Sequence, residues 1–189
     1  MNSVAGQSPI VIVGGGAGGL ELACKLGRRL GPQRVTLVDN KMFHIWKPSL
    51  HEVAAGTLDI HQEGLSYPML AYNSGFNFVL GAMEGLDAAN QQVLVAPVLG
   101  DSGEEVLPQR AIAYSELVLC VGSQSNYFGV QGAAEYTISL DGPQQAEQFR
   151  LRMLKQLAML DQQKKDDRDA KLSIVIIGAG ATGVELAAE

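Results

Sequence analysis

The chain has 189 residues, of which 47% are hydrophobic and 18% charged, and a formal net charge of -6. This composition argues against intrinsic disorder, and the acidic balance argues against nucleic acid as the main partner. The sequence contains neither the roughly 20 apolar residues of a membrane-spanning helix nor the basic start of a secretory signal. The length fits one domain, or one domain and the beginning of a second.

The first part of the chain carries the pattern of a strand, a helix and a second strand. The β-branched run at 9–13 shows no alternation, which is typical of a strand buried on both faces of a parallel sheet. Apolar residues at helical spacing follow, and Gly31-Pro32 ends that helix. Residues 34–39 form a second apolar run. The pattern predicts half of a doubly wound, Rossmann-like α/β domain.

The middle of the chain is less regular. Residues 40–75 predict a loop-rich excursion with one short helix, and the apolar, turn-bounded runs at 76–80 and 92–98 predict an antiparallel meander inserted at about 76–114. Residues 116–122 predict a strand that returns to the parallel sheet.

A long helix is expected from Pro143, because proline is favourable in a first helical turn. Residues 171–178 then repeat the opening strand, and a new helix begins shortly before Glu189. One strand and two helical turns cannot bury a core. We therefore expect a first domain over residues 1–170 and the truncated start of a second Rossmann-like domain over residues 171–189.

Glycines at the first strand-helix junction match a dinucleotide-binding loop. Gly14 allows the tight turn, Gly16 lets a pyrophosphate approach the backbone, and Gly19 permits close packing of helix on strand. Asp39 ends the second strand about 20 residues later, where a carboxylate can bind a ribose. A lone glycine motif can simply be a tight turn. Here, however, a strand, the glycines, an amphipathic helix, a second strand and a terminal acid all occur in register.

Gly178, Gly180 and Gly183 repeat the spacing near the end of the chain. Two dinucleotide motifs in one polypeptide are best explained by a flavin and a nicotinamide that exchange a hydride. The sequence therefore predicts an oxidoreductase.

The sequence resembles the bacterial type II NADH dehydrogenases of the two-dinucleotide-binding flavoprotein superfamily. The matching segments are 10–23, 44–56, 114–123 and 174–187. The glycine loops are generic to the superfamily, whereas the segment from Trp46 to Gly56 is more particular to these dehydrogenases. The resemblance implies an enzyme of about twice this length that oxidises NADH with FAD and reduces a membrane quinone.

The resemblance also implies roles for individual residues. Those expected to bind FAD are Gly14, Gly16, Ala17 and Gly18 at the pyrophosphate, Asp39 and Asn40 at the ribose, Lys47 at the phosphate or ribityl side, Met83 at the adenine, and Val121 and Gly122 in a second flavin signature. That signature usually has a hydroxyl at the position of Val121. A solvated loop lysine and a core methionine are the alternative interpretations of Lys47 and Met83.

Gly178, Gly180 and Gly183 would bind NADH, and Glu185 would be a catalytic carboxylate near the meeting point of nicotinamide and flavin. The alternative interpretation of Glu185 is an acid that interacts favourably with the dipole of its helix. Glu21 holds the equivalent position after the first loop and is expected to be a helix-start residue near the flavin.

The cysteines and histidines suggest no other chemistry. Cys24 and Cys120 form no redox pair of the kind that disulfide reductases need, and His44, His51 and His61 lack the spacing of a metal site. Two alternatives remain: another FAD- and NAD(P)H-dependent reductase of this architecture, or a non-catalytic FAD-binding fragment.

The expected partners of the full-length protein follow from the resemblance alone. They are a quinone and, through a region absent from this chain, the membrane surface, with a homodimer left open. The expected location is the cytoplasm or the cytoplasmic face of the bacterial inner membrane.

Overall fold

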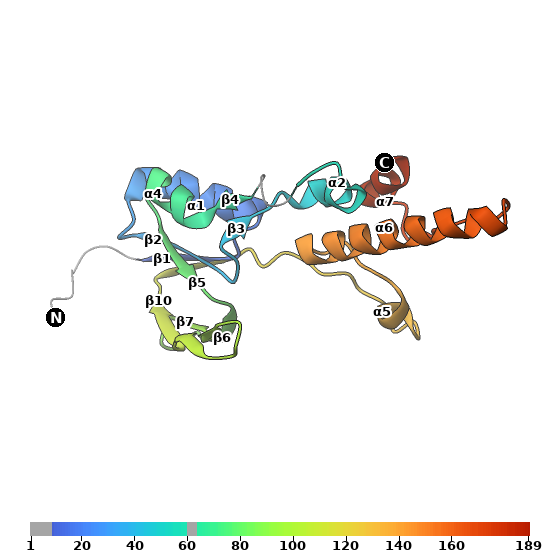
Figure 1. Ribbon diagram of the computed structural model, residues 1–189. Coiled ribbons are helices and arrows are strands. Elements are labelled where there is room, and N and C mark those ends of the chain that lie inside the picture. The colour runs from blue at the N-terminus through green and yellow to red at the C-terminus, as the bar shows by residue number, and fades with distance from the viewer. Residues whose placement is uncertain (1–8, 60–63) are drawn as a thin grey trace. The chain divides into compact units, whose positions relative to one another are not determined.

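A computed structural model describes residues 9–59 and 64–189 (Figure 1). The chain forms two compact units. The first unit comprises Met1–Ile45 and Gly64–Gly122, and the second comprises Trp46–Glu63 and Ser123–Glu189. This division differs from the expected boundary at residue 170, because the segment after Trp46 packs with the long helix near the C-terminus.

A four-stranded parallel sheet forms the centre of the first unit, in the order β11-β1-β2-β5. Its strands are β1 (Ile10–Val13), β2 (Val35–Asp39), β5 (Asn77–Leu80) and β11 (Glu116–Leu119). Helix α1 (Ala17–Leu30) connects β1 to β2, and α4 (Tyr67–Ser74) precedes β5. The doubly wound α/β fold predicted from the sequence is confirmed.

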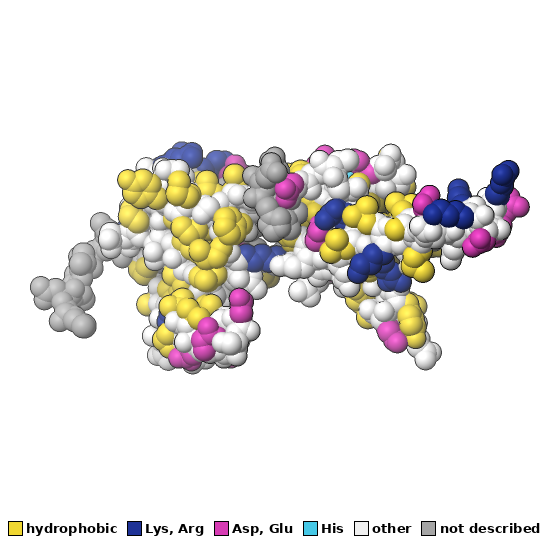
Figure 2. Space-filling model, in the orientation of Figure 1, with side chains coloured by type: hydrophobic (Ala, Val, Ile, Leu, Met, Phe, Trp, Pro, Cys, Tyr) yellow, Lys and Arg dark blue, Asp and Glu magenta, His cyan; other side chains and the backbone are white. Residues whose placement is uncertain are grey.

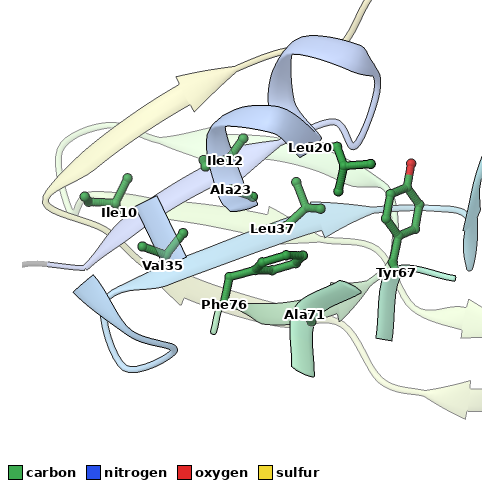
Figure 3. Packing of buried hydrophobic residues seen from close by; sticks show 9 residues of the cluster. All are labelled: Ile10, Ile12, Leu20, Ala23, Val35, Leu37, Tyr67, Ala71 and Phe76. Atoms are coloured by element: carbon green, nitrogen blue, oxygen red, sulfur yellow. The ribbon is translucent and has the colours of Figure 1, made fainter. Parts of the chain in front are cut away.

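Two hydrophobic clusters fix the layers of this unit. On one face of the sheet, Ile12 and Leu37 are fully buried against Leu20 of α1 and against Tyr67 and Phe76 (Figure 3). The other face buries a second set of valines, which are Val11, Val13, Val38, Val93 and Val95. The sheet is therefore apolar on both faces, as the lack of alternation in its strands requires.

The inserted meander covers that second face. It consists of antiparallel β6 (Met83–Asp87), β7 (Gln92–Val95) and β10 (Arg110–Ala113) in the order β10-β7-β6. The first unit also contains two short antiparallel strand pairs: β3 (Phe43–His44) with β4 (Leu65–Ser66), and β8 (Val98–Leu99) with β9 (Glu105–Leu107).

The expected start of the meander at residue 76 is wrong. Strand β5 pairs in parallel with β2, with Phe78 opposite Leu37, so it belongs to the central sheet. A short apolar run looks the same in either sheet, and periodicity alone cannot separate the two.

The second unit is helical. Its elements are the 3-10 turn η1 (Lys47–Ser49), α2 (Leu50–Ala55), α5 (Ala133–Tyr136), α6 (Pro143–Asp166) and α7 (Ala181–Ala188). Helix α2 packs against both α6 and α7. Only Ala146 of α6 is buried, and hydrophobic and charged side chains interleave over the surface of this helix (Figure 2).

The strand expected at 171–178 is not formed. Residues 171–179 contain no strand, and Val175 is 83% exposed. A strand needs a paired neighbour for its backbone hydrogen bonds, and the described part of the chain provides none there. Among the described residues, no helix is long and apolar enough to cross a membrane.

Candidate functional site

The first glycine loop, which connects β1 to α1, is held tightly at both ends. The Gly14 amide donates to the carbonyl of Val38 at 2.8 Å, and Gly14 has a φ of 99° that favours glycine. A Cβ on Gly14 would overlap the Cys120 carbonyl, and one on Gly19 would overlap the Gly14 carbonyl. The first and third glycines are therefore required by packing of the loop on itself and on the end of β11.

The middle of the loop is open. Among the described residues, and apart from the chain neighbours and the backbone of α1 itself, no heavy atom lies within 4 Å of a Cβ built on Gly16 or Gly18. Gly16 caps α1, and the first bond of the helix runs from the Leu20 amide to the Gly16 carbonyl at 2.9 Å. The amides of Ala17 and Gly18 precede that ladder, so they can bind an anion at the positive end of the helix dipole. This cradle fits a pyrophosphate.

Asp39, at the end of β2, lies against the same loop. Its Oδ2 accepts a hydrogen bond from the Gly15 amide at 2.6 Å, and its Oδ1 accepts one from the Lys41 amide at 2.8 Å. A carboxylate has about four acceptor sites, so these bonds leave capacity for ribose hydroxyls. The neighbouring Asn40 is exposed. The loop and the carboxylate predicted from the sequence are thus brought together.

Two further side chains hold the loop from the core side. The Tyr67 hydroxyl donates to the carbonyl of Gly15 at 2.7 Å, and His44 Nδ1 lies 2.9 Å from the same oxygen. A carbonyl only accepts, so this His44 nitrogen carries the proton. Tyr67 is 3% exposed and His44 is 7% exposed.

Burial raises the pKa of the Tyr67 phenol far above its ordinary value, and the charge of Asp39 raises it further. The phenol therefore keeps its proton and remains a donor. The sequence pattern predicts no role at this loop for either Tyr67 or His44. The only sequence signal was the position of His44 at the start of the segment shared with the dehydrogenases.

The other predicted flavin residues lie in varied surroundings. In the first unit, Met83 is partly buried and packs against the valine cluster of the second sheet face. Val121 is largely exposed, and Gly122 follows it with a φ of 72°. Glu21 forms an exposed pair with Lys25 at 2.6 Å.

Lys47, in the second unit, donates to the Ser123 carbonyl at 3.0 Å. Burial opposes ionisation of the nearby Asp141, but hydrogen bonds from Ser139 and Ser125 and the charge of Lys47 outweigh it and lower the Asp141 pKa. Lys47 is exposed, and its ammonium group donates to a carbonyl and acts electrostatically on the Asp141 carboxylate.

The second glycine loop reproduces the local geometry of the first. Gly178 has a φ of 113°, a Cβ on Gly183 would overlap the Gly178 carbonyl, and Gly180 caps α7. In the described ranges, no atom comes within 4 Å of a Cβ built on Gly180. This loop can also present helix amides to a phosphate.

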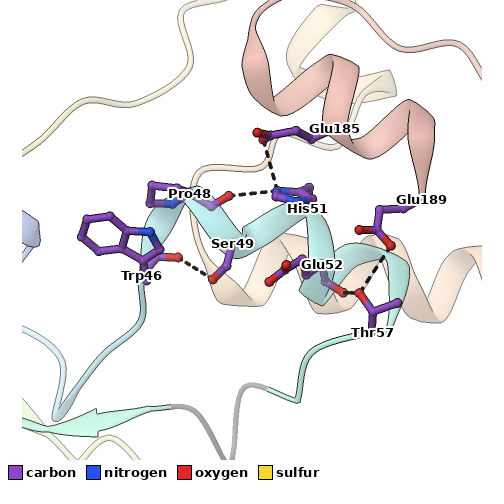
Figure 4. Close-up of polar contacts among 8 residues, drawn as sticks. All are labelled: Trp46, Pro48, Ser49, His51, Glu52, Thr57, Glu185 and Glu189. Carbon is purple, nitrogen blue, oxygen red and sulfur yellow. Dashed lines mark hydrogen bonds and ion pairs between the residues drawn. The ribbon is translucent and has the colours of Figure 1, made fainter.

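Glu185 lies in α7 beyond its first turn, and its side chain is 48% exposed. Its Oε2 is 3.3 Å from His51 Nδ1, which also lies 2.9 Å from the Pro48 carbonyl (Figure 4). Glu189, the C-cap residue of α7, accepts a 3.5 Å hydrogen bond from the Thr57 hydroxyl. Because Glu185 is outside the first turn and paired with a side chain, a simple helix-dipole role describes it poorly.

Cys24 and Cys120 are free thiols. Within 9–59 and 64–189, no group of three or more histidine, cysteine or acidic residues is arranged to hold a metal ion. His61 lies outside the described residues.

Two glycine loops of the dinucleotide-binding type, one of them on a doubly wound sheet with a carboxylate at its second strand, are the arrangement typical of dinucleotide-binding proteins. Residues 8–189 match the pyridine nucleotide-disulphide oxidoreductase family, and the chain belongs to it. The sequence is 40% identical to a type II NADH:quinone oxidoreductase of Haemophilus influenzae over 195 aligned residues, which cover 95% of this chain and 44% of that protein. It is 30% identical to a protein of the same name from Mycobacterium tuberculosis, over 95% of this chain and 37% of that protein.

Solved structures share the fold. NDH2 from Plasmodium falciparum in complex with NADH superposes with a TM-score of 0.66 at 18% identity, covering 81% of this chain and 30% of that one. A ferredoxin reductase from Rhodopseudomonas palustris gives a TM-score of 0.69 at 21% identity, covering 96% of this chain and 39% of that one. The chain spans less than half the length of the curated relatives named here.

Proposed function

We propose that this chain is the cofactor-binding part of a non-proton-pumping type II NADH:quinone oxidoreductase. The observation that carries the proposal is the pair of glycine cradles with matching geometry, in a chain 40% identical to an enzyme of that name. The first cradle holds FAD and the second holds NADH. FAD held in the first cradle would supply the chemistry of taking a hydride from NADH and passing two electrons on to quinone.

At the first cradle, the amides of Gly16, Ala17 and Gly18 bind the FAD pyrophosphate. Gly14 contributes through its turn rather than through its amide, because that amide already donates to Val38. Asp39 accepts from the adenosine ribose with its remaining acceptor sites.

The remaining flavin contacts come from residues outside the loop. Asn40 assists Asp39 at the ribose, Met83 lies at the adenine, and Lys47 lies along the phosphate or ribityl side. Val121 and Gly122 contact the flavin through their backbone, since Val121 has no hydroxyl to donate.

At the second cradle, Gly178, Gly180 and Gly183 hold the NADH pyrophosphate. Glu185 orients the nicotinamide or moves a proton near the reacting rings. Its half-exposed carboxylate, held by His51, is accessible to a ligand.

The proposed acceptor is a quinone, because the relatives are named NADH:quinone oxidoreductases. We further propose that the full-length protein works at the cytoplasmic face of the bacterial inner membrane, where quinone is dissolved, and docks there through a region outside this chain. A homodimer is compatible with this arrangement.

The test is reconstitution of the full-length protein with FAD, followed by anaerobic addition of NADH and then of different acceptors. We expect NADH to bleach the flavin absorbance within seconds. Addition of quinone should then restore it. Recovery only with a one-electron protein would identify a different reductase of the same architecture. A flavin that NADH never bleaches would identify a non-catalytic FAD-binding protein.

A further inference from the structure

The Gly15 carbonyl is saturated by side chains from two separate elements. Tyr67 begins α4 and His44 lies in β3, and each donates one hydrogen bond to this oxygen, at 2.7 Å and 2.9 Å. A carbonyl oxygen has two lone pairs, so both are used. The Gly15 amide is held as well, by Asp39. Three side chains therefore fix the two peptide units that meet at Gly15.

Fixing this carbonyl also fixes the amide that binds phosphate. A trans peptide is planar, so its C=O and N-H point in opposite directions. The donors of Tyr67 and His44 hold the Gly15 carbonyl toward the core, and the Gly16 amide consequently points the other way, to the open side of the loop. A run of glycines has the largest backbone freedom of any sequence, so this orientation needs an external restraint.

The restraint itself is rigid. The Tyr67 ring stacks on Phe78 with ring centroids 5.2 Å apart and meets the His44 ring edge-on at 6.3 Å. A Cβ on Gly15 would lie 2.5 Å from both the Cζ and the hydroxyl oxygen of Tyr67. The ring thus fills the space of a side chain at position 15. Its raised pKa keeps the donor proton in place throughout the neutral range.

We propose that Tyr67 and His44 are positioning residues for the flavin pyrophosphate, which they serve by orienting the Gly16 amide. The inference rests on the proposed binding of FAD at the first cradle. The second loop has no such pair among the described residues, so binding of NADH provides an internal reference.

The experiment uses the full-length protein stripped of its flavin and titrated with FAD and with ADP, which retains the pyrophosphate. Tyr67→Phe removes one donor and keeps the ring. Tyr72→Phe is the matched control, because Tyr72 lies in the same helix and is 88% exposed. All titrations are made at a temperature where circular dichroism shows each apoprotein fully folded, so that a loss of stability alone does not alter the dissociation constant.

We expect Tyr67→Phe to weaken binding of both FAD and ADP by about fivefold to tenfold, the value of one hydrogen bond. Tyr72→Phe should change either by less than about twofold, and the KM for NADH should stay constant in both variants. Equal affinities of wild type and Tyr67→Phe for FAD and ADP would overturn the inference. If the wild-type protein itself bound neither ligand, the proposed function would fail first.

A second pair of variants keeps the inference testable if Tyr67→Phe does not fold. His44→Asn retains a side-chain N-H close to the position of Nδ1, whereas His44→Leu removes the donor. We expect the asparagine variant to bind FAD within about twofold of wild type and the leucine variant to bind it about fivefold to tenfold more weakly. Equal affinities in these two variants would refute the role of the donor.

Discussion

Replacing Gly16 by alanine separates the function of the first loop from its folding. In the described residues a Cβ at this position meets no atom within 4 Å, and the backbone angles, φ -61° and ψ -176°, suit alanine. Losing the freedom of glycine in the unfolded chain stabilises a protein by about 0.4 to 1 kcal/mol at a compatible site. Alanine is a poorer N-cap than glycine, which offsets this gain, so we expect the apoprotein of Gly16→Ala to lie within about 1 kcal/mol of wild type.

The same methyl group occupies the space through which a pyrophosphate approaches the loop. We expect the affinity of Gly16→Ala for FAD to fall at least tenfold, which corresponds to about 1.4 kcal/mol. The assay is urea unfolding of the apoprotein alongside fluorescence titration with FAD. Binding should fall while stability changes little.

Gly19→Ala is the contrasting variant in the same loop. Its Cβ would overlap the Gly14 carbonyl and lie 3.1 Å from Cys120 Cβ, so the backbone of the loop must shift. Overpacking of this kind costs about 1 to 3 kcal/mol, and we expect the unfolding midpoint to fall accordingly. If Gly16→Ala bound FAD normally, or if it lost as much stability as Gly19→Ala, the assignment of the open cradle to phosphate would be refuted.

Three further predictions concern the residues around the loops. Asp39→Asn leaves one acceptor oxygen for the two amides of Gly15 and Lys41. The affinity for FAD should therefore fall about tenfold in the fluorescence titration. Unchanged affinity would contradict the role of Asp39. Because the folded pKa of Tyr67 is raised, its contribution to stability is complete below the ordinary phenol pKa of about 10 and is lost as the pH rises above it, by up to about 1.4 kcal/mol per pH unit. Between about pH 9 and 11, the free energy of unfolding measured with urea should therefore fall less steeply with pH in Tyr67→Phe than in wild type. Equal slopes in the two proteins would contradict the raised pKa of Tyr67. Glu185→Gln should slow NADH-dependent bleaching of the flavin about tenfold in stopped-flow measurements while FAD content stays constant; a normal rate would remove Glu185 from the reaction.

The parts of this fold that depend on residues close in the chain can be predicted from the sequence. The β-branched run of β1, the glycines and the apolar stripe of α1 predicted the first strand-helix-strand unit, because each depends on residues close in the chain. The sequence pattern placed β5 in the wrong sheet. Its partner β2 lies much earlier in the sequence, and an apolar run carries no information about which strand it pairs with. The strand expected at 171–178 failed for the same reason, as pairing is a property of neighbours in space.

The two glycine loops show which parts of a binding site can be predicted from the sequence and which cannot. Both adopt the same turn, with the third glycine packed on the carbonyl of the first, although only one of them follows a paired strand. The turn is therefore encoded by the glycine spacing itself. What distinguishes the first loop is the set of side chains on its Gly15 peptide groups: Asp39 from β2, His44 from β3 and Tyr67 from α4. Of these, only Asp39 stands at a spacing that a motif describes, because its distance along the chain is set by one helix and one strand. His44 and Tyr67 reach the loop through an irregular segment whose path no periodicity predicts, so the residues that orient the phosphate-binding amide become visible only in three dimensions.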